Sequence, residues 1–265
     1  MTQVWAHRGA RREAPENTLP AFERAVAQGA DGVELDVQLT ADGTMVVIHD
    51  ETLDRATNGS GLVAIRTLAE LQRLDASAGM PGFAGTRIPT LDEVLDLLVP
   101  TGVMINIELK NSCKEYPGLE RLVLEAATSS GAADRIVLST FNHYSLRALQ
   151  ELGATSELGM LYSDPLYNPW SYASGLNVGA IHPPVGCVLG PVYVRCAQEA
   201  GLAVRPWVAN HDYELRRLFK WGVDAVFTDV PGHARRIRDE LQPAGSRRSW
   251  RWSNAASGAD RKEAG

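Results

Sequence analysis

The chain has few cysteines, and their positions exclude two common uses of this residue. Cys113, Cys187 and Cys196 are the only three in 265 residues, and no two of them have the spacing of a zinc-ligand pair. An odd number leaves at least one cysteine without an intramolecular partner, which argues against a disulfide framework. We therefore expect three reduced cysteines in a cytoplasmic protein.

Long apolar runs are also missing. No uninterrupted apolar stretch approaches the roughly 18 residues of a transmembrane helix. The N-terminus leads directly into a predicted strand, without the pattern of a signal peptide. We therefore expect no stable insertion into a membrane.

Positive charge is not in excess. The chain carries 26 Lys and Arg residues against 32 Asp and Glu residues, a formal net charge of −6. A nucleic-acid surface requires a basic patch, so we expect no nucleic-acid partner. With 45% hydrophobic residues, the chain can build a sizeable core in one large domain or two small ones.

What the sequence does contain is a regular alternation of short apolar strands and helical segments. We predict eight strands, at residues 4–8, 32–37, 103–109, 136–139, 158–162, 179–182, 203–208 and 225–228. The helical segments end near glycines that allow a turn into the next strand, at Gly29, Gly102, Gly131, Gly153, Gly201 and Gly222. This count and length predict an α/β fold, a (β/α)₈ TIM barrel. An open doubly wound sheet is the alternative, but no glycine-rich phosphate loop follows the first strand.

One segment interrupts this alternation. Residues 44–50 have the pattern of a strand, but only residues 41–43 separate them from the strand before. That connection is too short for a parallel crossover and predicts a hairpin. Residues at equal distances from the turn oppose each other, so we expect His49 roughly opposite Asp36.

The segment after this early hairpin strand is longer than a barrel connection needs. Residues 51–90 are rich in glycine and contain one predicted helix, and we interpret them as a small insertion that caps the barrel mouth. We expect residues 1–242 to form a single domain that includes this insertion. The polar residues 243–265 lack periodicity, which predicts a disordered tail.

Polar residues occupy several of the predicted strands where apolar residues are usual. Glu34 and Asp36 lie two residues apart in one strand and therefore face the same side. Two such charges 4 Å apart repel by about 4 kcal/mol at an effective dielectric constant near 20, and a bound cation turns this repulsion into attraction. The other polar groups are His7, Arg8, His49, Asp50, Asn106, Glu108 and Lys110. Because strand ends meet at one rim of a barrel, we expect these groups to converge on one site.

The chemical types in this set indicate a metal-assisted reaction at phosphorus. Glu34, Asp36 and Glu108 offer only oxygen ligands, which favours Mg²⁺ or Ca²⁺ over zinc. Arg8 and Lys110 supply fixed positive charge suited to a phosphoryl group. The two histidines can act as general base and general acid near neutral pH, although spacing does not assign the two roles.

Several motifs resemble those of the glycerophosphodiester phosphodiesterases. They are His-Arg-Gly at 7–9, Pro-Glu-Asn-Thr at 15–18, the stretch 32–43, Val-Val-Ile-His-Asp at 46–50, Arg-Ala-Thr at 55–57, Ile-Glu-Leu-Lys at 107–110, Pro-Trp-Val-Ala-Asn at 206–210 and Thr-Asp-Val-Pro at 228–231. They follow the family's order from about residue 3 to residue 240. The resemblance implies a phosphodiesterase barrel, related to phosphatidylinositol-specific phospholipases C, that uses a divalent cation.

The resemblance also implies roles for individual residues. It makes Glu34, Asp36 and Glu108 the metal ligands, His7 and His49 the acid/base pair, Arg8 and Lys110 the contacts to phosphate, and Trp207 part of the pocket for the glycerol or head group. Val208 and Ala209 replace the family's usual Thr-Val after the tryptophan. This departure concerns the pocket wall and leaves the chemistry unaffected.

Other polar residues have simpler structural interpretations. We interpret Asp212 as the N-cap of the helix that follows it and Asp229 as the cap of the last helix. Lys110 could simply pair with a neighbouring carboxylate. His182, at a predicted strand end, is interpreted as a loop or surface residue and is the first such histidine to reconsider.

We therefore predict metal-dependent hydrolysis of glycerophosphodiesters, such as glycerophosphocholine, to sn-glycerol 3-phosphate and an alcohol. The expected partner is this small-molecule substrate, and the sequence assigns neither a head-group preference nor an oligomeric state. One alternative is a lysophospholipase D acting on single-chain lysophospholipids, which needs an apolar groove at the rim, with 80–83 and 170–172 as candidate walls. A non-catalytic phosphodiester-binding barrel is the other, and it is disfavoured because a binding module needs no acid/base pair.

Overall fold

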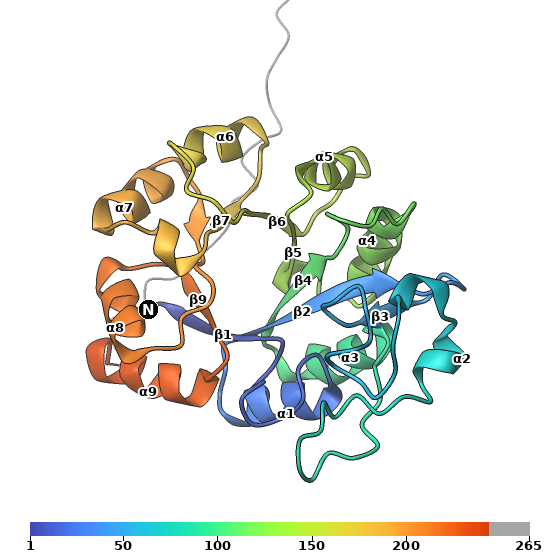
Figure 1. Ribbon diagram of the computed structural model, residues 1–265. Helices are drawn as coiled ribbons and strands as arrows, with labels where there is room; N and C mark the ends of the chain where they lie inside the picture. The colour runs from blue at the N-terminus through green and yellow to red at the C-terminus, as the bar shows by residue number, and fades with distance from the viewer. Residues whose placement is uncertain (244–265) are drawn as a thin grey trace, which may run out of the picture.

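The computed structural model describes residues 1–243, in which parallel strands form a barrel surrounded by helices (Figure 1). Neighbouring strands follow the order β8-β7-β6-β5-β4-β2-β1-β9, and all pairs in this order are parallel. Their bounds are Gln3–His7 (β1), Gly32–Leu39 (β2), Met104–Leu109 (β4), Ile136–Thr140 (β5), Glu157–Leu161 (β6), Ala180–His182 (β7), Ala203–Val204 (β8) and Ala225–Thr228 (β9). The predicted (β/α)₈ TIM barrel is confirmed.

The barrel is completed between β8 and β9 by a segment that is not a regular strand. Backbone hydrogen bonds run from Asp224 N to Val204 O, from Phe227 N to Pro206 O and from Ala209 N to Phe227 O, each 2.9 Å long. The predicted strand at 203–208 is therefore wrong in its length, because Pro206 has no N–H group to donate to a ladder.

Helices cover the outside of the barrel. They are Leu19–Ala27 (α1), Leu68–Leu71 (α2), Leu91–Leu98 (α3), Leu119–Ser129 (α4), His143–Glu151 (α5), Pro169–Gly175 (α6), Pro191–Glu199 (α7), Asp212–Trp221 (α8) and Pro231–Leu241 (α9), with 3₁₀ turns at Val63–Ile65, Val99–Thr101, Ala133–Arg135 and Val185–Cys187. The six glycines predicted to end helical segments all have positive φ, between 69° and 82°. No helix within residues 1–243 combines the length and the apolar character needed to cross a membrane.

Alternation along the strands separates an apolar outer face from a polar interior. Val33, Leu35 and Val37 of β2 lie in the main core cluster that also contains buried residues of the helices. The residues between them, Glu34 and Asp36, face the interior of the barrel with their neighbours on β4. The structure also contains a small buried apolar cluster, formed by Trp5, Val137, Ala225 and Phe227, and the buried ion pair of Glu157 with Arg205. The strand period thus turns Glu34 and Asp36 into the barrel and their apolar neighbours toward the helices.

The predicted hairpin is present, with a register one residue from the expected one. Strand β3, Met45–Val47, pairs antiparallel with β2, and Val47 lies opposite Val37. Ile48, rather than His49, therefore continues the ladder opposite Asp36, through a 3.0 Å hydrogen bond from Ile48 N to Asp36 O. His49 follows directly, where the chain leaves the ladder.

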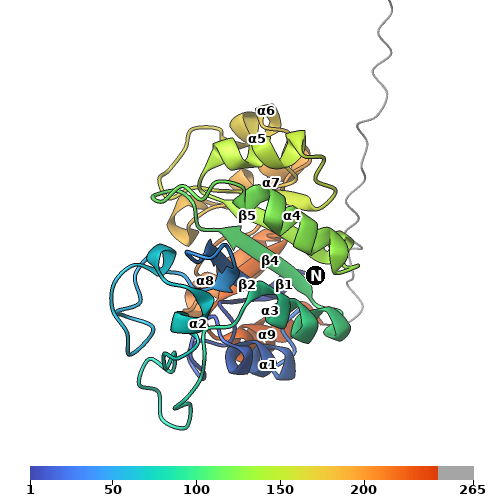
Figure 2. The ribbon, with the colours of Figure 1, turned by 90° about the vertical axis from the view of Figure 1, so that its right-hand side faces the viewer.

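The 51–90 insertion has a small core of its own. Six of its buried residues pack against Val46 and Ile48 of the hairpin: Leu53, Ala56, Val63, Leu71, Ala76 and Ile88. Figure 2 shows the insertion at one end of the barrel, with the N-terminus at the opposite end. The single domain and the capping role stay predictions, and the predicted tail at 243–265 lies, apart from Pro243, outside the described residues.

Candidate active site

Three carboxylates from two adjacent strands form the centre of the site. The β2–β4 register places Asp36 opposite Glu108 and Glu34 opposite Asn106. Glu34, Asp36 and Glu108 are only 3%, 1% and 8% exposed. One oxygen from each lies within 4.8 Å of the others, so a single ion could contact all three.

The hydrogen-bonding state of this cluster fits a hard cation. Among the described residues, the buried acceptors Glu34 Oε1, Asp36 Oδ1 and Asn106 Oδ1 have no hydrogen-bond partner. Buried polar atoms are almost always satisfied, and coordination to a cation would satisfy these acceptors. The donor set is all oxygen, which is the set that Mg²⁺ and Ca²⁺ prefer.

Burial and the charges around them shift the pKa values of the three carboxyl groups in different directions. Burial, reinforced by Asp36 and Glu108, raises the pKa of Glu34 well above its usual range. Burial and the charge of Asp36 raise the pKa of Glu108 to about 7. Burial acts in the same direction on Asp36, but Arg8, His49 and Lys110 outweigh it and lower the pKa of that carboxyl. Without a cation, Asp36 therefore keeps its charge, while Glu34 and Glu108 tend to hold protons that a metal ion would displace.

Two basic side chains lie against this acidic centre. Arg8 Nε lies 3.3 Å from Asp36 Oδ2, and the backbone N of Arg8 donates to Glu34 Oε2 at 2.8 Å. Lys110 Nζ donates to Glu108 Oε1 at 2.7 Å and lies 3.8 Å from Asp36 Oδ1. The pairing considered for Lys110 is thus present, and the same ammonium also reaches the imidazole of His49.

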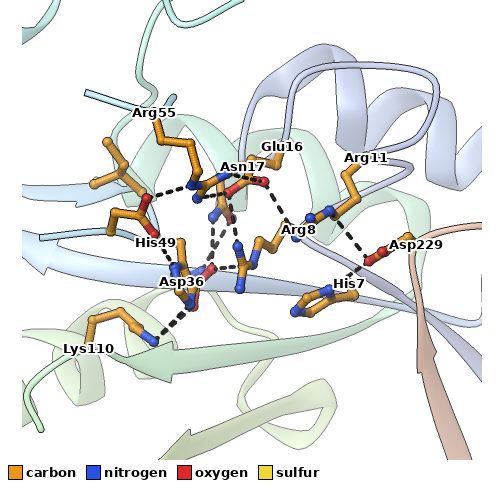
Figure 3. A network of polar contacts seen from close by, with 12 residues as sticks. His7, Arg8, Arg11, Glu16, Asn17, Asp36, His49, Arg55, Lys110 and Asp229 are labelled. Atoms are coloured by element: carbon orange, nitrogen blue, oxygen red, sulfur yellow. Dashed lines mark hydrogen bonds and ion pairs between the residues drawn. The ribbon is translucent and has the colours of Figure 1, made fainter. Parts of the chain in front are cut away.

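Both predicted histidines are held by a carboxylate through the same ring nitrogen. His7 Nδ1 contacts Asp229 Oδ1 at 2.8 Å, and His49 Nδ1 contacts Asp50 Oδ1 at 2.6 Å (Figure 3). Lys110 Nζ lies 3.2 Å from His49 Nε2, and since an ammonium can only donate, Nε2 is the acceptor and Nδ1 carries the proton. Burial lowers the pKa of both imidazoles, although Asp229 opposes the shift at His7 and Asp36 opposes it at His49.

The structure corrects the interpretation of Asp229. The N-cap of α9 is Val230, and Asp229 instead faces the barrel mouth, where Asn210 also holds it through a 2.8 Å bond from Nδ2 to Oδ2. Asp229 lies two residues after the inward-facing Phe227, so the strand period could have predicted this direction. Asp212 is likewise not a cap: His211 is the N-cap of α8, and Asp212 contacts His233 at 2.7 Å.

Gln38 is a site residue that the sequence did not reveal. It is fully buried on the same face of β2 as Glu34 and Asp36, and its Nε2 donates to the carbonyl oxygens of Ile48, His49 and Asp50 at 3.0, 3.0 and 2.8 Å. Its Oε1 accepts a 2.9 Å bond from the hydroxyl group of Tyr116. Residues 48–50 lie beyond the end of β3, and the Gln38 side chain therefore holds their carbonyl groups in place of the backbone hydrogen bonds of a β-sheet.

A cavity of about 130 Å³ opens beside these groups. It is lined by His7, Arg8, Glu34, His49, Asn106, Glu108, Phe141, Leu161, His182, Trp207 and Phe227. The predicted pocket residue Trp207 is here, packed edge-on against Phe141 at 5.7 Å between ring centroids. His182 is a lining residue too, fully buried and 3.3 Å from an Arg205 nitrogen, so its interpretation as a surface residue is wrong.

The walls considered for a lipid groove lie elsewhere. Neither 80–83 nor 170–172 contributes to the lining of this cavity. A larger surface hollow of about 420 Å³ is lined mainly by residues of α9, together with Glu13 and Gln28, and contains none of the predicted site residues.

Comparison with known proteins gives concordant matches over most of the chain. The model of the glycerophosphoryl diester phosphodiesterase family matches residues 7–233. A glycerophosphodiester phosphodiesterase from Caldanaerobacter subterraneus subsp. tengcongensis is 42% identical over 231 residues, which covers 87% of this chain and 95% of the relative. One from Bacillus altitudinis is 41% identical, covering 91% and 100%. A solved structure of an Oleispira antarctica phosphodiesterase in complex with the product sn-glycerol-3-phosphate has a TM-score of 0.80 and 31% identity, covering 90% of this chain and 97% of that one.

Proposed function

The chain belongs to the glycerophosphoryl diester phosphodiesterase family, an enzyme family, and we propose that it hydrolyses glycerophosphodiesters to sn-glycerol 3-phosphate and an alcohol. The observation that carries this proposal is the meeting of three buried carboxylates with two carboxylate-held imidazoles at one small cavity. The substrate class is that of the relatives' names, and the solved relative from Oleispira antarctica holds the proposed product.

Glu34, Asp36 and Glu108 are the proposed ligands of a divalent cation, Mg²⁺ or Ca²⁺. Their unpartnered buried oxygens and their all-oxygen chemistry support this assignment. A bound ion of this kind supplies Lewis-acid stabilisation of the charge that develops on a phosphoryl group.

His7 and His49 are the proposed acid/base pair. In one route, the glycerol 2-hydroxyl oxygen attacks phosphorus while one imidazole takes its proton. The bond to the head-group oxygen breaks, and the other imidazole gives that oxygen a proton. Water then opens the cyclic phosphate with the proton transfers reversed. Direct attack by water uses the same two groups.

Each imidazole is oriented for this work by its Nδ1 contact. Asp229 and Asp50 hold the rings through Nδ1, so Nε2 is the proposed proton-transfer atom of each imidazole; at His49, substrate would take over the contact that Nε2 makes with Lys110. Arg8 and Lys110 would bind and orient the phosphoryl oxygens, since both lie at the carboxylate cluster and carry fixed positive charge.

The size of the cavity supports a small substrate. About 130 Å³ is below the roughly 300–1,000 Å³ of common drug-sized pockets, so the cavity suits a glycerol or phosphate group better than an acyl chain. We propose that Trp207, with its apolar neighbours, forms the wall against which the carbon skeleton lies. Residues 1–242, with the 51–90 insertion, would act as one phosphodiesterase domain.

Turnover of glycerophosphocholine by the full chain, with and without a chelator, tests this function. We expect activity that is lost on chelation and restored by Mg²⁺ or Ca²⁺, and that is abolished in Glu34→Ala and His49→Ala variants that keep the fold. Faster turnover of lysophosphatidylcholine than of glycerophosphocholine would instead identify a lysophospholipase D. Binding of glycerophosphodiesters without turnover under any metal condition would identify a non-catalytic barrel.

A further inference from the structure

The 51–90 insertion sends one charged side chain into the site. Arg55 lies between Leu53 and Ala56, which are 1% and 8% exposed and anchored in the core of the insertion. Its own side chain is 48% exposed and reaches back to the barrel. The backbone of Arg55 is thus held by the insertion, while its guanidinium group belongs to the network in Figure 3.

This guanidinium group contacts two carboxylates at once. Arg55 Nε donates to Asp50 Oδ2 at 2.6 Å, and its two terminal nitrogens donate to the two oxygens of Glu16 at 2.9 and 2.7 Å. A two-pronged contact of this type fixes the plane of the carboxylate as well as its distance.

Each of these carboxylates has a second partner in the proposed machinery. The other oxygen of Asp50 holds His49 Nδ1 at 2.6 Å, and Glu16 Oε1 also accepts from Arg8 Nη1 at 3.0 Å. A continuous chain of contacts therefore runs from His49 through Asp50, Arg55 and Glu16 to Arg8. One end is the proposed acid/base imidazole and the other is the proposed phosphate-binding arginine.

We propose that Arg55 is a positioning residue, which sets the imidazole of His49 and the guanidinium of Arg8 at their working separation. This inference rests on the proposed function, and it gives the insertion a part in the site beyond covering it. Arg55 acts through Asp50 and Glu16 rather than on the substrate. An ordinary exposed ion pair would contribute only to stability, and only slightly.

The guanidinium group of Arg55 allows a positioning role to be distinguished from a simple effect of charge. Lysine keeps the charge of arginine but presents a single nitrogen, which cannot reproduce three contacts in fixed directions. If position is what matters, Arg55→Lys will behave like Arg55→Met. If charge alone matters, Arg55→Lys will behave like the wild type.

The test compares both variants with Arg66→Met in the full chain, with glycerophosphocholine as substrate and Mg²⁺ or Ca²⁺ present. Arg66 is a matched control, since it also lies in the insertion, is 43% exposed and pairs with Glu70 at 3.8 Å. We expect Arg55→Met and Arg55→Lys to lower kcat/KM by about 10- to 100-fold, with kcat reduced and KM raised, because small misplacements of catalytic groups cost this much. Arg66→Met should keep both constants.

A spectroscopic measurement on the same proteins does not depend on activity. With ¹³C-labelled histidine, the ring signal of His49, assigned by its absence in His49→Gln, should shift in both Arg55 variants and stay in place in Arg66→Met. An unmoved His49 signal, or full activity in Arg55→Lys, would overturn the inference. A wild-type protein without phosphodiesterase activity would overturn the proposed function instead, while the histidine spectra would still decide the role of Arg55.

Discussion

Replacing one proposed metal ligand should make the metal-free protein more stable. Glu108 is buried beside Asp36, and its pKa is raised from 4.5 to about 7, a value that already includes the favourable contact with Lys110. The unfolded chain releases this proton near pH 4.5 and the folded protein near pH 7. The folded state thus binds more protons in this window, and its stability falls as the pH rises through it.

The size of this effect follows from the displaced pKa. A tenfold change in proton affinity corresponds to 1.36 kcal/mol. Above pH 7, the carboxyl group of Glu108 therefore lowers the free energy of unfolding by about 3 kcal/mol. Glu108→Gln removes the ionisable group and keeps its shape. At pH 7.5 in a chelator, the variant should therefore melt roughly 6–12 °C above the wild type, by the scale for domains of about this size.

A divalent cation should remove or reverse this difference in melting temperature between Glu108→Gln and the wild type. The wild type gains about 2.7 kcal/mol when Mg²⁺ or Ca²⁺ is present at a hundred times its Kd, whereas Glu108→Gln has lost a charged ligand and gains less. Thermal unfolding followed by circular dichroism, in chelator and in saturating cation, measures both effects. The reasoning would be refuted by a variant that is no more stable than the wild type in chelator, or by one that gains as much as the wild type from the cation.

A second buried carboxylate serves as the control. Glu157 is also buried inside the barrel and, like Glu108, contacts a basic group at 2.7 Å. However, Glu157 and its partner Arg205 lie outside the carboxylate cluster, whereas Lys110 would keep Asp36 at 3.8 Å if Glu108 were replaced. Removing one member of a buried pair leaves the other uncompensated. Glu157→Gln should therefore lower the melting temperature with and without the cation, which separates relief of repulsion from a general effect of removing charge.

Three further predictions concern metal affinity, Gln38 and Asp229. Affinity for Mg²⁺ or Ca²⁺ should fall as the pH drops below about 7, because the ion must displace the proton on Glu108. Calorimetry in buffers of different ionisation enthalpy should show that binding releases protons. An affinity that does not change with pH would contradict this prediction. Gln38→Met should lower kcat with little change in KM and cost about 2 kcal/mol of unfolding free energy, since it removes the donors to three carbonyls around His49. Gln150→Met, which loses bonds to two carbonyls far along the chain, should destabilise without slowing turnover, and equal loss of turnover in both would count against a role for Gln38. Asp229→Asn should lower kcat at least about tenfold, because an amide cannot stabilise the protonated ring of His7 as a carboxylate does. It should also lower the melting temperature, because the amide NH2 group would face His7 Nδ1 or Asn210 Nδ2, and unchanged kcat would exclude Asp229 from orienting His7.

Local patterns were sufficient for the architecture and for the acidic centre. Strand period and helix-ending glycines predict the eight strands, and the two-residue spacing of Glu34 and Asp36 places both on one face whatever the surroundings. The pairing of Asp36 opposite Glu108 comes from the β2–β4 register in the structure, but alternation alone turns Glu108 to the same face of its strand as Asn106 and Lys110. Such information lies within a few residues of chain, so the sequence alone carries it.

What only the tertiary structure decided is which distant side chains meet. Asp229 is 222 positions from His7, and although the strand period gives the direction of its side chain, nothing near it in the sequence identifies His7 as its partner. Gln38 looks like any polar strand residue until the hairpin brings the carbonyls of residues 48–50 within 3.0 Å of its amide. Arg55 lies in the 51–90 insertion, and the small core of that insertion decides where its side chain points. These hydrogen bonds join residues that are distant in the sequence, so they depend on how the elements of the whole chain pack together and not on any single segment.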